Sequence, residues 1–184
     1  MNKRIVFLVL IFGLITLGNA QEKYLCKNGH IWIYSHTPFE DIEAHNNEVA
    51  SVITTTGDVA FQMLIKSFKF KRALMEEHFN ENYMESGKYP KSDFKGKIIN
   101  LDSISFSKSG IYIAVVDGNL TIHNTSRKIH QTGRMEIKEN KIYLTTKFDV
   151  VPQNYGIEIP SAVRDKIAKT ITINVEMVYD LYKK

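Results

Sequence analysis

Histidine, asparagine and tyrosine side chains are concentrated in one stretch of the chain, residues 78–90, whose sequence is His-Phe-Asn-Glu-Asn-Tyr-Met-Glu-Ser-Gly-Lys-Tyr-Pro. The stretch connects two strand-like segments, and binding residues occur more often in loops than in strands. Such groups could hold the polar head of a ligand, with arginine and lysine suited to a phosphate or carbonyl group. Alternatively, these side chains pack the connection against the rest of the protein or are ordinary solvated surface charges. The candidates for head-group binding are Arg72, His78, Asn80, Tyr83, Lys88 and Tyr89.

Metal binding and covalent catalysis leave recognisable spacings, and the sequence contains none of them. The six histidines form no H-x-x-x-H pattern, and no cysteine–histidine set has zinc-like spacing. G-x-S-x-G, P-loop and G-x-G-x-x-G motifs are also absent. Cys26 is the only cysteine, so no intramolecular disulfide can form. We therefore predict no metal, no cofactor and no enzymatic activity; a hydrolase or isomerase using His78 or His123 is the alternative.

The elements that must position these residues are strands. In residues 171–182, apolar side chains at every second position alternate with mostly polar ones. Period-two alternation predicts a strand with one buried face. The same alternation occurs in residues 59–65, 111–122, 134–138 and 141–150. Tight hairpin turns are predicted at Thr56-Gly57-Asp58, Glu139-Asn140 and Asn28-Gly29.

Helical periodicity is confined to residues 71–79 and, more briefly, to residues 161–168, and both segments connect strands. About eight strands without long helices predict an antiparallel sandwich or barrel. A barrel would remove the edges that long strands otherwise expose. A ring of about eight strands is just wide enough to be filled by side chains or to hold one slim ligand. Pattern alone leaves the choice between barrel and sandwich open.

The N-terminus has the layout of an export signal. Lys3 and Arg4 precede the apolar run 5–17, and Gly18-Asn19-Ala20 supplies small residues for cleavage. The run is shorter than the about 20 residues of a membrane span, so an uncleaved anchor is the weaker alternative. We predict a signal peptide at residues 1–20, a single domain at 21–184 and a periplasmic or secreted protein. Cleavage removes two of the net +4 charges, which leaves too little positive charge to predict nucleic-acid binding.

Two blocks of the sequence resemble a known family. The first consists of residues 78–90 followed by Phe94-Lys95-Gly96-Lys97, and the second is Gly118-Asn119-Leu120-Thr121-Ile122-His123. In order and spacing these blocks resemble the YceI-like family of bacterial periplasmic lipid- and polyisoprenoid-binding proteins, and the resemblance extends over residues 24–182. The family usually has a glycine after the second block, where this chain has Asn124. Because asparagine tolerates a left-handed backbone, we expect the turn to be kept.

The resemblance implies an all-β fold, namely an elongated eight-stranded antiparallel lipocalin-like β-barrel with one or two short helices in its connections. It also implies that an isoprenoid or a similar long apolar chain lies inside the barrel, with the candidate head-group residues at its mouth. A core filled by side chains is the alternative, since protein interiors are normally close-packed. The inward positions that would line the bore are Phe61, Met63, Ile65, Phe94, Ile98, Leu120, Ile122, Leu144, Phe148, Ile173, Val175 and Met177.

The expected function is that of an exported lipid-binding protein that carries or sequesters its ligand. Its partner would be a long-chain isoprenoid or another lipid, and any contact with a membrane surface would be transient. A filled barrel would instead favour a protein-interaction module, whose docking surface would include Trp32 and Tyr34. The sequence leaves the identity of the lipid and the oligomeric state open.

Overall fold

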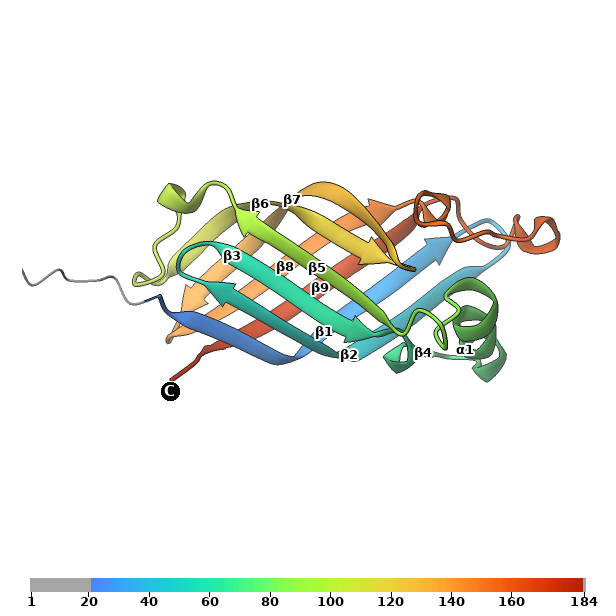
Figure 1. Cartoon of the computed structure of the whole chain (residues 1–184), viewed down its shortest axis with the longest axis horizontal. Coiled ribbons are helices and arrows are strands. Elements are labelled where there is room, and N and C mark those ends of the chain that lie inside the picture. The colour runs from blue at the N-terminus through green and yellow to red at the C-terminus, as the bar shows by residue number, and fades with distance from the viewer. Residues whose placement is uncertain (1–20, 184) are drawn as a thin grey trace, which may run out of the picture.

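Eight antiparallel strands close into an elongated barrel in the computed structural model, which describes residues 21–183 (Figure 1). The strands are β1 (Lys23–His36), β2 (Asp41–Thr54), β3 (Asp58–Leu64), β4 (Lys69–Phe70), β5 (Lys91–Ile98), β6 (Gly110–Ile122), β7 (Thr125–Lys138), β8 (Lys141–Val150) and β9 (Ile171–Leu181). Their order around the ring is β1-β9-β8-β7-β6-β5-β3-β2, and pairing of β1 with β2 closes it, while the short β4 adds to β2. The predicted all-β barrel is therefore confirmed, and the sandwich is excluded.

Alternating burial along the strands separates the inside of the barrel from the outside. In β9, Ile173, Val175 and Met177 are buried, whereas the intervening Glu176 and Val178 are exposed. The predicted period-two pattern is thus confirmed in this strand. Every second side chain of a barrel strand points inward, so the apolar positions read from the sequence form the interior.

Two hairpin turns, the one predicted at Glu139-Asn140 and the one that follows the second family-like block, have a left-handed backbone at both central residues. His123 and Asn124 join β6 to β7 with φ angles of 50° and 58°, and Glu139 and Asn140 join β7 to β8 with 53° and 61°. Turns of this kind match the twist of the strands that they connect. Asn124 therefore keeps the turn without the family's glycine, as expected from its tolerance of this conformation.

The hairpin predicted at Asn28-Gly29 is wrong, because both residues lie inside β1. This strand pairs with β2 on one side and with β9 on the other, and its register is irregular around Gly29. A Cβ atom at Gly29 would lie only 2.0 Å from Sδ of Met177, so the glycine makes room for a core side chain. Pairing on both sides therefore overrides the local turn signal.

Short helical segments lie in the connections, and two of the longer connections meet at one end of the barrel (Figure 1). The segment predicted at 71–79 contains α1 (Ala73–His78), which continues as a π-helical turn at Phe79–Tyr83. The segment predicted at 161–168 contains only a 3-10 turn, Ser161–Val163. Further 3-10 turns lie at Ile65–Ser67, Leu101–Ser103 and Pro152–Tyr155. Among the described residues, no helix has the length and apolar character needed to cross a membrane.

Candidate functional site

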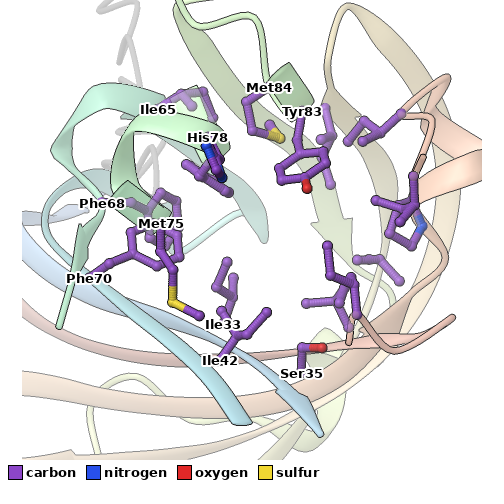
Figure 2. A pocket seen from close by; sticks show the side chains of 18 of the residues that line it. Ile33, Ser35, Ile42, Ile65, Phe68, Phe70, Met75, His78, Tyr83 and Met84 are labelled. Carbon is purple, nitrogen blue, oxygen red and sulfur yellow. The ribbon is translucent and has the colours of Figure 1, made fainter. Parts of the chain in front are cut away.

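A cavity of about 410 Å³ occupies the end of the barrel that carries α1 (Figure 2). Inward side chains of the barrel strands form its base, and two connections form its sides. The residues of the base include Ile33, Ile42, Met63, Ser92, Ile122 and Ile173. Most of the lining is aliphatic or aromatic, so the cavity suits an apolar ligand.

One side of the cavity is formed by residues 68–84, and α1 is held in place by both aromatic and polar contacts. The ring of Phe79 packs against Phe68 and Phe70, with centroids 5.5 and 5.0 Å apart. Nζ of Lys69 donates to Oε1 of Glu76 at 2.6 Å, and this contact lowers the pKa of the Glu76 carboxyl. These contacts fasten the helix to β4 and the barrel. Met75, His78, Tyr83 and Met84 then line the cavity (Figure 2).

The other side is formed by residues 150–167, which cover a gap in the barrel wall. Backbone pairing between the two strands is confined to Arg134–Lys138 of β7 and Lys141–Thr145 of β8. The two strands therefore separate toward the α1 end. Tyr155 and Ile157 are buried there, and burial raises the pKa of the Tyr155 hydroxyl. The guanidinium of Arg127 in β7 donates to the carbonyl of Asn154 and ties this segment to the wall.

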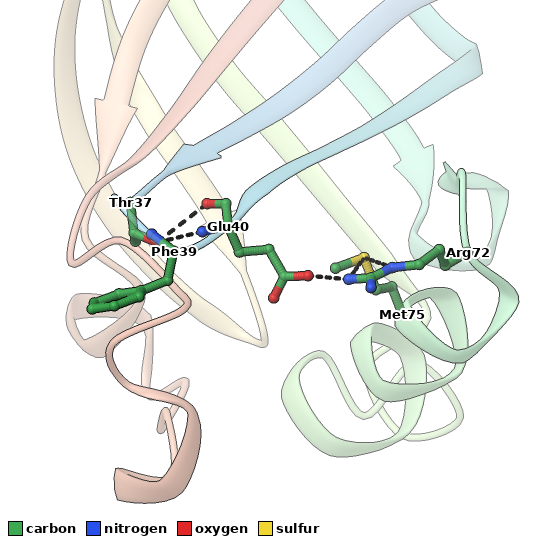
Figure 3. Close-up of polar contacts among 5 residues, drawn as sticks. All are labelled: Thr37, Phe39, Glu40, Arg72 and Met75. Carbon is green, nitrogen blue, oxygen red and sulfur yellow. Dashed lines mark hydrogen bonds and ion pairs between the residues drawn. The ribbon is translucent and has the colours of Figure 1, made fainter.

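An ion pair crosses the rim of the cavity (Figure 3). Arg72, at the start of α1, donates to the carboxylate of Glu40, which lies in the turn between β1 and β2. Thr37 orders that turn, because its hydroxyl accepts from the Glu40 backbone N–H at 3.0 Å. The Arg72 guanidinium also donates to Sδ of Met75 at 3.3 Å. The ion pair therefore links two segments of the rim.

The six candidate head-group residues separate into two groups. Arg72, His78 and Tyr83 line the cavity. The other three, Asn80, Lys88 and Tyr89, do not line it. Nδ2 of Asn80 donates to the carbonyl of Glu76 at 2.9 Å, which stabilises the end of α1. Contact of any of the six with a ligand stays a prediction.

Lys88 and Tyr89 belong instead to a polar cluster that joins the two family-like blocks. Nζ of Lys88 lies 4.8 Å from the centre of the Tyr89 ring, and that ring meets His123 edge-on at 4.3 Å. Nε2 of His123 lies 2.9 Å from a carboxylate oxygen of Glu85. The connection 78–90 is thus fixed onto the β6–β7 hairpin, which gives these residues a structural role.

The twelve predicted lining residues also separate by depth in the barrel. Met63, Ile65, Ile122 and Ile173 line the cavity. The remaining eight pack into the hydrophobic clusters, away from the cavity surface: Phe61, Phe94, Ile98, Leu120, Leu144, Phe148, Val175 and Met177. The cavity therefore lies at the α1 end, while farther in Phe94, Ile98, Leu120, Val175 and Met177 are buried and Phe61, Leu144 and Phe148 are partly buried. Lipid contact by any of these positions stays a prediction.

Sequence reasoning assigned no site residue to the side formed by residues 150–167. Its apolar positions Tyr155, Ile157 and Ile159 alternate between two prolines, Pro152 and Pro160, which was a usable signal for an extended segment with one buried face. The pattern is too short and irregular to predict a strand, and the structure has no strand there. The segment covers the cavity through tertiary packing.

The histidines of the described residues lie in pairwise contacts with polar neighbours or in the cavity lining. Within residues 21–183, no group of three or more His, Cys, Asp or Glu could hold a metal ion. The ring nitrogens of His36, His123 and His130 contact carboxylates, and His30 contacts His45. Contacts of this kind orient the imidazole rings.

Comparison with known proteins agrees with this architecture. The sequence profile of the YceI-like domain matches residues 27–179. The chain belongs to the YceI-like family. No curated protein sequence matches this YceI-like chain significantly.

Several solved structures share the fold of this family member. A polyisoprenoid binding domain from Saccharophagus degradans is similar with a TM-score of 0.75 and 11% identity, covering 87% of this chain and 98% of that one. Burkholderia cenocepacia BcnA has a TM-score of 0.65 and 10% identity, covering 82% and 95%. A Campylobacter jejuni YCEI protein has a TM-score of 0.62 and 14% identity, covering 81% and 90%. At such identities the likeness shows the fold alone.

Proposed function

We propose that this protein binds a lipid by enclosing its apolar tail in the cavity at the α1 end of the barrel. The observation that carries the proposal is a cavity of about 410 Å³ with a mostly apolar lining and charged residues at its rim. Binding pockets of about 300–1,000 Å³ with few polar groups are typical of small-molecule sites. A similar fold in a polyisoprenoid binding domain supports an isoprenoid or similar chain as the ligand.

The polar residues of the lining fit a ligand whose head lies at the mouth. Ser92 and Ser35 are already engaged within the protein, since Oγ of Ser92 donates to the Thr121 carbonyl and Oγ of Ser35 accepts from the Ala168 N–H. Two basic side chains line the cavity near its rim: Lys166, and Arg72, which is paired with Glu40. Basic groups there would favour a head that carries phosphate, carboxylate or carbonyl oxygen.

The free energy needed for binding supports a role for both the tail and the head of the ligand. Micromolar affinity requires about 8 kcal/mol net, in addition to about 4–15 kcal/mol for the cost of association. Burial of a methylene contributes about 0.8 kcal/mol, so about 15–30 methylenes would be needed from the tail alone. A tail near the lower end of that range therefore needs head-group contacts at the mouth.

The test is native mass spectrometry of protein purified from its own host, followed by lipid extraction. A lining variant, Met63→Trp, should reduce lipid recovery strongly, because the indole would occupy the cavity. Leu64→Trp is the matched control, since Leu64 follows Met63 in sequence but faces outward and is exposed. Empty wild-type protein in repeated preparations, or equal loss of lipid in both variants, would contradict the proposal.

Export and carriage belong to the same proposal. The signal peptide predicted at residues 1–20 lies outside the described residues. Intact-mass analysis of the exported protein should give Gln21 as its first residue, and a different first residue would refute the predicted cleavage.

Phe39 and Leu74, near the rim, are 74% and 61% exposed and offer apolar contact with a membrane surface during loading. Co-sedimentation with anionic vesicles should weaken in Phe39→Ser, and unchanged co-sedimentation would argue against this contact.

A further inference from the structure

The cavity ends at a definite level in the barrel, where one layer of inward side chains replaces open space. Met63, Ser92 and Ile122 line the cavity from β3, β5 and β6. Inward positions recur every second residue along a strand, so the next inward residues away from the mouth are Phe61, Phe94 and Leu120. Phe61 pairs directly with Phe94, and Phe94 pairs with Leu120. The cavity lining includes none of these three residues.

Phe61 and Phe94 form an aromatic floor beneath the cavity. Their rings stack with centroids 5.6 Å apart and planes inclined by 19°, and Phe94 is only 5% exposed. Gly96 and Gly118 lie under the Phe94 ring, since a Cβ atom on either would come within 2.5 Å or 2.4 Å of its Cζ atom. The missing side chains leave room for the Phe94 ring at this position, one inward layer below the cavity. Phe148, in β8, packs against both hydrophobic clusters.

The volume above the aromatic floor limits the length of chain that can be enclosed. A cavity of about 150 Å³ holds benzene, with six carbon atoms, so about 410 Å³ holds about 16 non-hydrogen atoms. We infer that the ligand is a lipid with a single chain of about 16 carbons, and that Phe61 and Phe94 set this limit. An isoprenoid of about three units and an acyl chain of the same length share this chemistry. The inference rests on the proposed function, because it concerns the ligand of the same cavity.

The limit predicts a break in the plot of affinity against chain length, because affinity should rise only while added carbons still fit in the cavity. Each methylene enclosed in the cavity should tighten binding about fourfold. Carbons beyond the sixteenth would remain in water at the mouth and add little. The dissociation constant should therefore fall steeply up to about 16 carbons and then level off.

The experiment measures dissociation constants of delipidated protein for two series of probes. Saturated fatty acids of about 8–24 carbons form one series, and isoprenoid alcohols of about 10–30 carbons form the other, so the two ligand sources are distinguished. Phe94→Ala removes about six carbons of side chain and should move the break to about 22 carbons. Phe61→Ala, at a less buried position, is the second variant if Phe94→Ala does not fold. Phe106→Ala is the control, because Phe106 packs on Tyr24, outside the cavity lining, and its loss should leave the break in place.

The outcomes separate this inference from the proposed function. Absence of binding in both series would overturn both. Affinity that continues to rise fourfold per carbon well beyond 16 carbons would overturn the length limit and leave the proposed function intact. A break near 16 carbons that does not move in either folded phenylalanine variant, or that moves equally in Phe106→Ala, would overturn the assignment of the limit to the aromatic floor.

Discussion

Replacing Gly118 by alanine should destabilise the barrel through the ring of Phe94. A Cβ atom at this position would lie 2.4 Å from Cζ and 2.6 Å from Cε2 of Phe94, and 2.6 Å from the carbonyl oxygen of Lys95. Carbon atoms in good contact are about 3.5–4.0 Å apart, so the ring must move by more than 1 Å or the strands must separate. Adjustments of this kind in a packed core cost about 1–3 kcal/mol.

A smaller opposing effect comes from the unfolded chain. Alanine has less conformational freedom than glycine, which stabilises the folded state by about 0.4–1 kcal/mol where the native backbone suits alanine. We therefore expect Gly118→Ala to lower the free energy of unfolding by about 1–2 kcal/mol. The assay is denaturant titration of lipid-free protein, since bound ligand would add its own stabilisation.

A double-mutant cycle identifies the cause. Phe94→Leu shortens the side chain over Gly118, so the loss from Gly118→Ala should be smaller in that background, with a coupling energy of about 0.5–3 kcal/mol. Gly87→Ala is the control, because a Cβ atom there meets nothing within 4 Å, and it should be neutral or slightly stabilising. Strict additivity in the cycle, or a Gly118→Ala protein as stable as wild type, would refute the steric argument.

Four further predictions concern other parts of the barrel. Tyr179→Phe removes a hydroxyl that lies 2.9 Å from that of Ser51 and should lower the unfolding free energy at pH 7 by about 0.5–1.5 kcal/mol; an unchanged denaturant midpoint would contradict this. Burial raises the pKa of Tyr179 above its unfolded value of about 10, so wild-type stability should fall as pH rises past about 10, and less steeply in the variant; parallel pH profiles would argue against this tyrosine as the source. Asn124→Gly should be neutral in thermal melts, whereas Asn124→Ala should cost about 1 kcal/mol, and equal melting of the two would speak against a left-handed requirement. Glu40→Gln, which breaks the ion pair with Arg72, should speed release of a fluorescent fatty acid about two- to fivefold in stopped-flow traces, and unchanged rates would show that the pair does not restrain the rim.

The alternation of apolar and polar residues determined the buried face of the strands at residues 59–65, 111–122, 134–138, 141–150 and 171–182. Ile173, Val175 and Met177 follow this rule in β9, because a pleated strand turns successive side chains to opposite faces whatever lies next to it. The two-residue turn at His123 and Asn124 was likewise predictable, since its backbone depends on local residue type. Asn28-Gly29 shows the limit of such signals: hydrogen bonding of β1 to neighbours on both sides outweighs the preference of two residues.

Which inward residues line open space was decided only by the tertiary structure. Met63 and Phe61 look equivalent in the sequence, as apolar residues two positions apart on the same face of β3, yet one lines the cavity and the other lies in the floor beneath it. The difference depends on Phe94 in β5, which stacks on Phe61, and on Gly96 and Gly118, which leave room for the Phe94 ring. Periodicity along one strand gives the direction of a side chain, whereas the space in front of it depends on residues distant in the chain, and these come together only when the barrel closes.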